Sequence, residues 1–313
     1  MRRTASNPRS QNRRSYARMP ESTTTERGAV LMDYESRDFP VFRPIADLSP
    51  DQYDHFSDAY ATLAACRDES MFNFVRACVM DLIDYIVKVG NTAIETRSVP
   101  RTDERGSDVG EYVRTLSLSA SNAFFVYRDH RTHAAKVLSE KRGDSTKTTI
   151  KSMLDDLNAN CFGYRWLLEL RNALMHMDLR SVSFSVKVSA DAEPSFTLNM
   201  DREQVLQTNN LKNARNAALR EELKALPDDP SVIDLLQEAL PAIAETEREV
   251  LKALYPESVR RDAGLVVCEL IDLFEGRRGT YCLFTGPGFT AEDRIPPHYR
   301  LEPEVLSHAE TYR

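Results

Sequence analysis

The sequence predicts a mainly α protein: a helical bundle with a small β-hairpin and an additional C-terminal helical segment. Three observations predict this fold class. Long stretches repeat apolar residues with the helical period, one short stretch alternates apolar and polar residues as a strand does, and the 313 residues include only 11 glycines. The hydrophobic content of 42% and the charged content of 28% are those of an ordinary globular protein, and the length allows a sizeable core.

Residues 1–29 form a basic tail, which we expect to be disordered because it can bury little apolar surface. Six arginines precede its first acidic residue, Glu21. Such a tail either contacts RNA or an acidic partner or has no role of its own, and we favour the second interpretation. Residues 30–47 alternate and contain Pro40 and Pro44, which predicts an extended arm or an edge strand.

Residues 30–180 are expected to carry the helical bundle. Ser49 and Pro50 are typical of a helix start, with the serine at the cap and the proline in the first turn. After the break at Gly143, Asp144 is expected to cap another helix. Short loops between helices predict antiparallel neighbours. The expected helices cover residues 50–66, 68–96, 110–140, 144–158 and 161–178.

Beyond residue 180 the spacing of the apolar residues changes from the helical period to the alternation of a strand. Residues 181–200 alternate apolar and polar side chains on both sides of Pro194, which predicts a β-hairpin with one face buried. Residues 201–276 form the C-terminal helical segment, with helices expected at 211–226, 231–254 and 256–274. Pro241 is expected to kink or split the second of these. Residues 277–313 are expected to hold a short strand, 281–284, and a Pro-rich tail.

The chemistry is concentrated in the helix 161–178. At about 100° per residue, its apolar residues fall within an arc of about 120°, as in a helix that packs on a core. Four polar residues fall within about 60° of one another on a different side, and Arg171 lies alone at the edge of the apolar arc. The apolar residues are Trp166, Leu167, Leu170, Ala173, Leu174 and Met177, and the polar residues are Arg165, Glu169, Asn172 and His176.

The run from Arg171 to His176, RNALMH, resembles the Arg-x4-6-His motif of the HEPN superfamily (higher eukaryotes and prokaryotes nucleotide-binding). The likeness covers this motif and its helical setting. It implies a HEPN-like all-α domain with the motif near a helix end, and a metal-independent endoribonuclease of the kind found among toxins and antiviral defence factors. It also implies a homodimer in which two motifs face each other.

The resemblance implies a role for each polar residue. His176 would carry a proton, since imidazole titrates near neutral pH, and Arg171 would bind the phosphate. Asn172 would orient the imidazole or the phosphate. Glu169 and Arg165 would fix the histidine tautomer or extend the phosphate site. Because Arg171 and His176 are about 140° apart around one helix, the geometry also favours a homodimer.

Two alternatives remain open. Arg171 can be a structural side chain paired with Glu169 or Asp178, with His176 stabilised at the helix end. The protein would then be a regulatory dimer unrelated to that family, and the polar residues would form an ordinary salt-bridged face. In the other alternative, the protein keeps the HEPN-like scaffold as a catalytically inactive nucleotide-binding or interaction dimer. A second Arg-x4-His run, Arg128 to His133, ranks lower because every residue between its ends is polar.

Composition narrows the binding partners, the metal sites and the compartment that the protein can have. The formal net charge of −7 argues against broad binding to a nucleic-acid backbone, but not against contact with one phosphate in a small cleft. Five scattered cysteines without CxxC spacing indicate neither a disulfide framework nor a zinc site. His130 and His133 lack further ligands, so no metal or cofactor is expected. No apolar run reaches 18 residues and no secretory signal is recognisable. We therefore expect a cytoplasmic protein that binds no membrane. The resemblance implies RNA, a second copy and an antitoxin or regulatory protein as its partners.

Overall fold

The computed structural model describes residues 26–33, 41–98, 100–102, 106, 108–187, 195–286 and 297–313. The chain forms two compact units. One, the sheet unit, comprises the chain up to Asp58 and Cys268–Leu306, and the other, the helical unit, comprises Ala59–Val267 and Ser307–Arg313. The boundaries fall within three helices, α1 (Pro50–Cys66), α10 (Glu257–Leu273) and α11 (Pro303–Glu310). The expected basic tail lies outside the described residues up to position 25.

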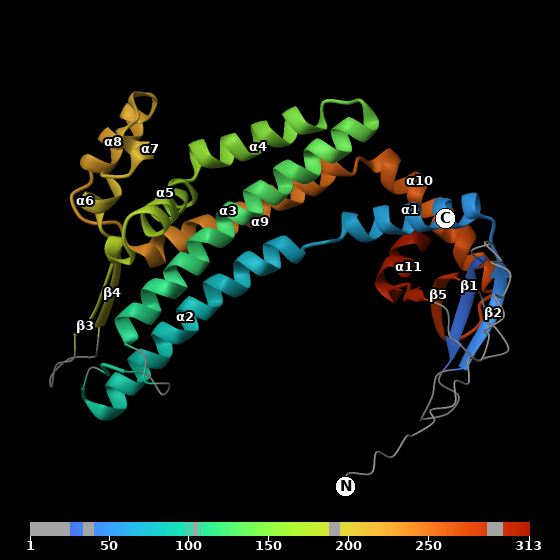
Figure 1. Cartoon of the computed structure of the whole chain (residues 1–313), viewed down its shortest axis with the longest axis horizontal. Coiled ribbons are helices and arrows are strands. Elements are labelled where there is room, and N and C mark those ends of the chain that lie inside the picture. The colour runs from blue at the N-terminus through green and yellow to red at the C-terminus, as the bar shows by residue number, and fades with distance from the viewer. Residues whose placement is uncertain are drawn as a thin grey trace, which may run out of the picture. The chain divides into compact units, whose positions relative to one another are not determined.

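The helical unit confirms the mainly α fold class, with small antiparallel β elements. Its long helices pack in pairs, α2 on α3, α3 on both α4 and α5, and α9 on both α4 and α5, and Figure 1 shows α2, α3 and α9 running alongside one another. The helix α9 thus joins the bundle, whereas it was expected in a separate C-terminal segment, 201–276. The bounds are α2 (Ser70–Thr96), α3 (Val109–Arg142), α4 (Thr146–Asn160), α5 (Phe162–His176) and α9 (Val232–Leu254).

The core of this unit forms where the apolar stripes of these helices meet. On α5, the expected apolar residues from Trp166 to Leu174 are buried, whereas Met177 is 45% exposed because the helix ends one residue before it. The Tyr164 ring meets the Phe124 ring of α3 edge-on at 6.2 Å between centroids. The largest fully buried side chains here are Trp166, Tyr127, Tyr164, Phe124, Leu63, Leu82, Ile150 and Leu154.

The turn between α3 and α4 follows the expected pattern. Gly143 adopts φ +69° after the last residue of α3, and its N–H bonds to the Ser139 carbonyl, a helix ending that favours glycine. The carboxylate of Asp144 accepts a hydrogen bond from the Thr146 N–H at 2.9 Å. The predicted break is confirmed, but the predicted cap is not, because Ser145 occupies the N-cap of α4 and Asp144 bonds from the position before it.

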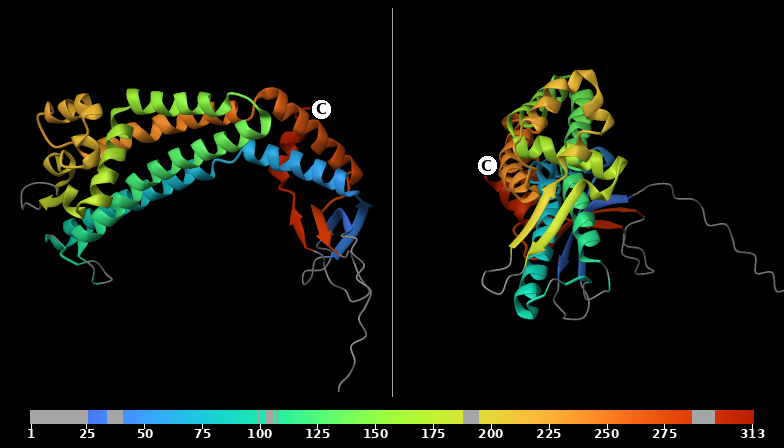
Figure 2. Two further views of the ribbon diagram at one scale, coloured as in Figure 1. Left: turned by 45° about the horizontal axis from the view of Figure 1, so that its top comes forward. Right: turned by 90° about the vertical axis from the view of Figure 1, so that its left-hand side faces the viewer.

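The predicted hairpin is also present. The strands β3 (Val182–Lys187) and β4 (Ser195–Met200) pair antiparallel, with Val182 opposite Met200. Val182, Leu198 and Met200 are buried in the helical core, whereas Phe196 is 43% exposed. Figure 2 shows the two strands as a separate ribbon beside α3, which contacts β3. Pro194 lies outside the described residues.

The prediction of one helix over residues 211–226 is wrong in its extent. The chain instead forms α6 (Arg202–Val205), α7 (Asn209–Lys212), the 3-10 turn η2 (Ala214–Asn216) and α8 (Ala217–Lys224). The Asn213 side chain accepts the Arg215 N–H at 3.1 Å, and the Asn216 side chain donates to the Asn210 carbonyl at 2.9 Å. Such side chain–backbone bonds compete with helix formation. In contrast, α9 continues through Pro241 without a break.

The sheet unit contains a four-stranded antiparallel sheet in the order β2-β1-β5-β6. The segment expected as an arm or edge strand supplies two strands, of which β1 is interior, and Pro44 lies on the edge strand β2, where its missing N–H is tolerated. The tail expected to be only Pro-rich ends in β6 and α11. The bounds are β1 (Glu26–Asp33), β2 (Val41–Asp47), β5 (Thr280–Gly286), β6 (His298–Arg300) and α11 (Pro303–Glu310).

The start of α1 confirms the capping prediction. The Ser49 hydroxyl accepts the Gln52 N–H at 3.2 Å, and the Gln52 side chain accepts the Ser49 N–H at 3.0 Å. This reciprocal pair satisfies two N–H groups that the helix leaves free. Within the sheet unit, Val30 and Met32 of β1 form a small apolar cluster with Cys282 and Phe284 of β5.

Candidate functional site

The helix α5, which carries the RNALMH run, is fixed at its N-terminus by α9. The Glu238 carboxylate accepts the backbone N–H groups of Phe162 and Gly163 at 2.9 and 3.1 Å. A carboxylate at this position satisfies free N–H groups and opposes the positive end of the helix dipole. Gly163 lies directly against the backbone of Leu235 on α9, where a Cβ would collide with the Leu235 carbonyl oxygen. The absence of a side chain therefore allows the two helices to approach closely.

Arg171 is held across the contact between α5 and α3. Its Nε donates to Asn122 Oδ1 at 3.2 Å and its Nη1 donates to Asn172 Oδ1 at 3.3 Å. The guanidinium carbon lies 4.2 Å from the centre of the Phe125 ring, a stacked cation–π arrangement. Within the described residues Arg171 forms no ion pair with Glu169 or Asp178. The alternative interpretation, which expected such a pair, is wrong on this point.

Asn172 connects Arg171 to a network of amide side chains. Its Nδ2 donates to Glu169 Oε2 at 3.5 Å, and the Nδ2 of Asn210 donates to Glu169 Oε1 at 2.5 Å. Asn216 in turn donates to Asn210 Oδ1 at 3.0 Å. Glu169 is only 7% exposed, so its carboxylate acts as a buried acceptor that ties α5 to the segment α7–η2.

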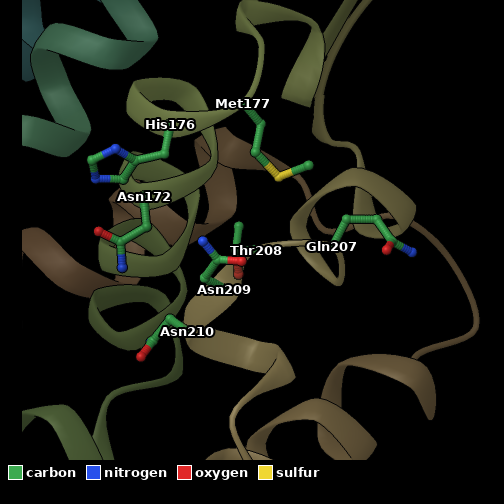
Figure 3. A pocket seen from close by; sticks show the side chains of 7 residues that line it. All are labelled: Asn172, His176, Met177, Gln207, Thr208, Asn209 and Asn210. Atoms are coloured by element: carbon green, nitrogen blue, oxygen red, sulfur yellow. The ribbon is translucent and has the colours of Figure 1, made fainter.

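A cavity of about 630 Å³ opens beside the C-terminal end of α5. Asn172 and His176, one turn apart on α5, line one side, and the segment Gln207–Asn210, which leads into the first turn of α7, lines the other (Figure 3). His176 is exposed, and it is the only ionisable side chain among the described lining residues. The lining residues are Asn172, His176, Met177, Gln207, Thr208, Asn209 and Asn210.

Arg165 lies apart from this cavity. Its Nη1 donates to the carbonyls of Asn158 and Ala159 at 3.0 and 2.7 Å, and its Nη2 pairs with Glu222 on α8 at 2.5 Å. These bonds satisfy carbonyls at the C-terminal end of α4. Arg165 thus ties α4, α5 and α8 together, and no contact of the described residues joins it to His176.

Of the five site residues expected from the sequence, the structure brings two into one cavity, Asn172 and His176. Arg171 and Glu169 reach that cavity indirectly, because each bonds to Asn172. The opposite wall, Gln207-Thr208-Asn209-Asn210, was not singled out in the sequence. Its only signal is a run of four neutral polar residues, three of them amides.

The second Arg-x4-His run has an ordinary surface role. Arg128 Nη2 pairs with Asp155 on α4 at 2.9 Å, while His133 is exposed on α3. Among the described residues no group of histidines, cysteines and acids is arranged to hold a metal ion.

The cysteines are free thiols, and four of the five are buried. Burial raises the pKa of the Cys66 thiol to about 11 and also raises the pKa of the Cys161 thiol. A thiol with a raised pKa is a poor nucleophile. The Cys161 sulfur instead accepts the Tyr164 N–H at the start of α5.

Comparisons with protein-family models, curated proteins and solved structures find no match to this chain. In the described part of the chain, each helix is too short or too polar to cross a lipid bilayer.

Proposed function

We propose that this protein is a metal-independent endoribonuclease of the HEPN type, acting on cytoplasmic RNA as a toxin or antiviral effector. The observation that carries the proposal is the position of His176: an exposed imidazole at the end of α5, on a polar cavity that it shares with Asn172. A nuclease of this kind needs only to move protons and to stabilise negative charge. The RNALMH run supplies residues suited to both tasks.

The reaction proceeds by attack of the ribose 2′-hydroxyl on the adjacent phosphorus. A base accepts the proton of the 2′-hydroxyl, the bond to the 5′-oxygen breaks, and an acid returns a proton to that oxygen. The products are a 2′,3′-cyclic phosphate and a 5′-hydroxyl. His176 is the proton carrier, because imidazole exchanges protons near neutral pH.

Arg171 is suited to stabilise the charge on the phosphorus. Its guanidinium is oriented by Asn122, Asn172 and the Phe125 ring, and its Nη2 has no hydrogen-bond partner among the described residues. A guanidinium held in advance loses little entropy when it binds a phosphate, so two N–H donors are presented at low cost.

The same geometry supports a homodimer. Arg171 does not line the cavity that contains His176, and the two residues point about 140° apart around α5. A second copy related by a two-fold axis can bring its Arg171 to the His176 of the first.

The test is cleavage of single-stranded RNA by the full-length chain in the presence of EDTA, with products analysed by mass spectrometry. We expect 2′,3′-cyclic phosphate ends, and a rate at least about 100-fold lower for His176→Ala, the usual loss when a general acid–base group is removed. His133→Ala is the matched control, since it alters an equally exposed histidine in the other Arg-x4-His run. Normal cleavage by His176→Ala would refute the proposal.

A second candidate is an inactive HEPN-like scaffold that binds a nucleotide or a regulatory partner, such as an antitoxin, without cleavage. The observation that favours it is the cavity lining, which has no lysine or arginine among the described residues. Saturable nucleotide binding that is unchanged by His176→Ala, with no RNA cleavage, would support this candidate over the first.

A further inference from the structure

The segment Gln207–Asn210, which includes the first two residues of α7, gives the cavity beside His176 an uncharged, amide-rich wall. Carboxamides contribute a donor and an acceptor side by side, and the edge of a nucleobase presents the same pair of groups. A phosphate inside the cavity would instead require cationic side chains, and none lines it among the described residues. The lining is therefore suited to a base rather than to a backbone phosphate.

The carboxamides of Asn172 and Asn210 already have partners. Both donate to Glu169, and Asn210 Oδ1 also accepts from Asn216. The carboxamide of Asn209 has no hydrogen bond within the described part of the chain, and the residue is exposed. Figure 3 shows it directed toward the side chain of Asn172, on the side where His176 lies. Asn209 thus presents an unused donor and acceptor.

The position of Asn209 is fixed by its neighbour. Thr208 is 4% exposed, its hydroxyl accepts the Leu211 N–H at 3.4 Å, and its carbonyl accepts the Lys212 N–H at 3.1 Å. Above the cavity, the Met177 side chain is 45% exposed. A thioether is polarizable and packs well on an aromatic face, so Met177 offers a surface for the face of a base.

We propose that Asn209 reads the edge of one unpaired nucleobase in this cavity, with Met177 covering the face of the base, and thereby selects the phosphate presented to His176. The inference rests on the proposed function in that the ligand is RNA. It restricts the substrate to single strands, because a duplex already uses the base edges that Asn209 would contact.

Asn91 provides a matched control for Asn209. It is an exposed asparagine on α2, its side chain has no hydrogen bond among the described residues, and it does not line the cavity. Removing its carboxamide changes the surface polarity by the same amount without removing a group from the cavity.

The experiment measures binding separately from cleavage. Full-length protein is titrated with fluorescent single-stranded 2′-O-methyl oligonucleotides, each containing one base type, in EDTA. The methyl group removes the attacking hydroxyl, so anisotropy reports affinity alone. We expect the best base to bind about tenfold more tightly than the worst, as for one edge contact. Asn209→Ala should reduce this ratio to about twofold, and Asn91→Ala should preserve it.

Equal affinity for all four oligonucleotides, no binding of any of them, or an unchanged preference in Asn209→Ala would overturn the inference. Loss of preference in Asn91→Ala to the same degree would also overturn it. Base-dependent binding that requires Asn209, without cleavage of ordinary RNA, would support the inference while refuting the nuclease. Cleavage of RNA without any base preference would support the nuclease and overturn the inference about Asn209.

Discussion

Arg131 on α3 and Glu247 on α9 form an ion pair inside the helical unit, where their side chains are 4% and 3% exposed. Further hydrogen bonds hold the pair: Glu247 Oε2 accepts from Arg131 Nε and from the Tyr127 hydroxyl, each at 3.0 Å, and Arg131 Nη2 donates to the Asp68 carbonyl at 3.2 Å. Burial, and then the charge of Glu247, raise the pKa of Tyr127. The phenol therefore remains protonated and donates to Glu247.

Removing one member of this pair should destabilise the helical unit strongly. Glu247→Leu leaves the Arg131 guanidinium buried without a counter-charge, and we expect a loss of about 3–5 kcal/mol in the free energy of unfolding. The double variant Arg131→Met with Glu247→Leu should recover most of that loss. Urea unfolding followed by circular dichroism gives the values, with the exposed pair partner Glu249→Gln as control. A loss below about 1 kcal/mol for Glu247→Leu, typical of an exposed pair, would contradict the prediction.

The buried carboxylate of Glu169 should not be replaceable by an amide. In Glu169→Gln one of the two acceptor oxygens becomes an NH2 group that faces the Nδ2 of Asn172 or Asn210. We expect a loss of about 1–3 kcal/mol in stability, the cost of an unsatisfied buried donor, together with weaker RNA binding. The measurements are urea unfolding and oligonucleotide anisotropy. Wild-type stability together with wild-type RNA affinity in Glu169→Gln would show that the hydrogen bonds of Glu169 support neither wall of the cavity.

The close approach of α5 to α9 predicts that Gly163 tolerates no side chain. In Gly163→Ala the new Cβ meets the Leu235 carbonyl oxygen and lies 3.1 Å from Glu238 Cβ, so the helices must separate. Overpacking of this kind costs about 1–3 kcal/mol. In the control Gly110→Ala the new Cβ meets the side chain of Asp108 at 3.2 Å, which can move. The midpoint temperature of thermal unfolding should be clearly lower in Gly163→Ala and nearly unchanged in Gly110→Ala. Equal decreases in the two variants would contradict the close packing of α5 on α9.

The sequence predicted the long helices because each has a continuous apolar stripe. The helix from Pro50 to Cys66 also has its Ser49 cap, and α3 ends at Gly143 as expected. The interior position of β1 was not predictable, because its partner β5 is about 250 residues away. The helix expected at 211–226 was wrong because Asn213 and Asn216 bond locally to the backbone, which amphipathic periodicity does not reveal.

For the site, the period of α5 placed Asn172 and His176 on one face, and both line the cavity. The same periodicity grouped Arg165 with them, but that side chain bonds to the end of α4. The contacts of Arg171 with Asn122 and Phe125 depend on how α3 packs on α5. The Gln207–Asn210 wall likewise depends on how the chain returns after β4, and no local pattern specifies either feature.

Arg171 should not be replaceable by lysine. Lysine keeps the charge but loses the planar fork, the bond to Asn122 and the stack on Phe125. If Arg171 stabilises the charge on the phosphorus, Arg171→Lys should lower the rate of RNA cleavage by about 100-fold or more, as for the loss of a comparable donor. Stability should change little, since the side chain is only partly buried. Arg128→Lys is the matched control, and an equal loss of rate in that variant would remove the special role of Arg171.

A composite site predicts that two inactive variants restore activity when they are mixed. In a homodimer in which His176 of one copy works with Arg171 of the other, a heterodimer of His176→Ala with Arg171→Ala contains one intact pair. Random exchange makes about half of the dimers mixed, each with one of two sites intact, so about a quarter of the wild-type rate should return. The rate is followed with a fluorogenic RNA after co-refolding or prolonged mixing. If the subunits exchange but the mixed dimers remain inactive, His176 and Arg171 of each site come from the same copy. In that arrangement no site of a mixed dimer has both residues intact.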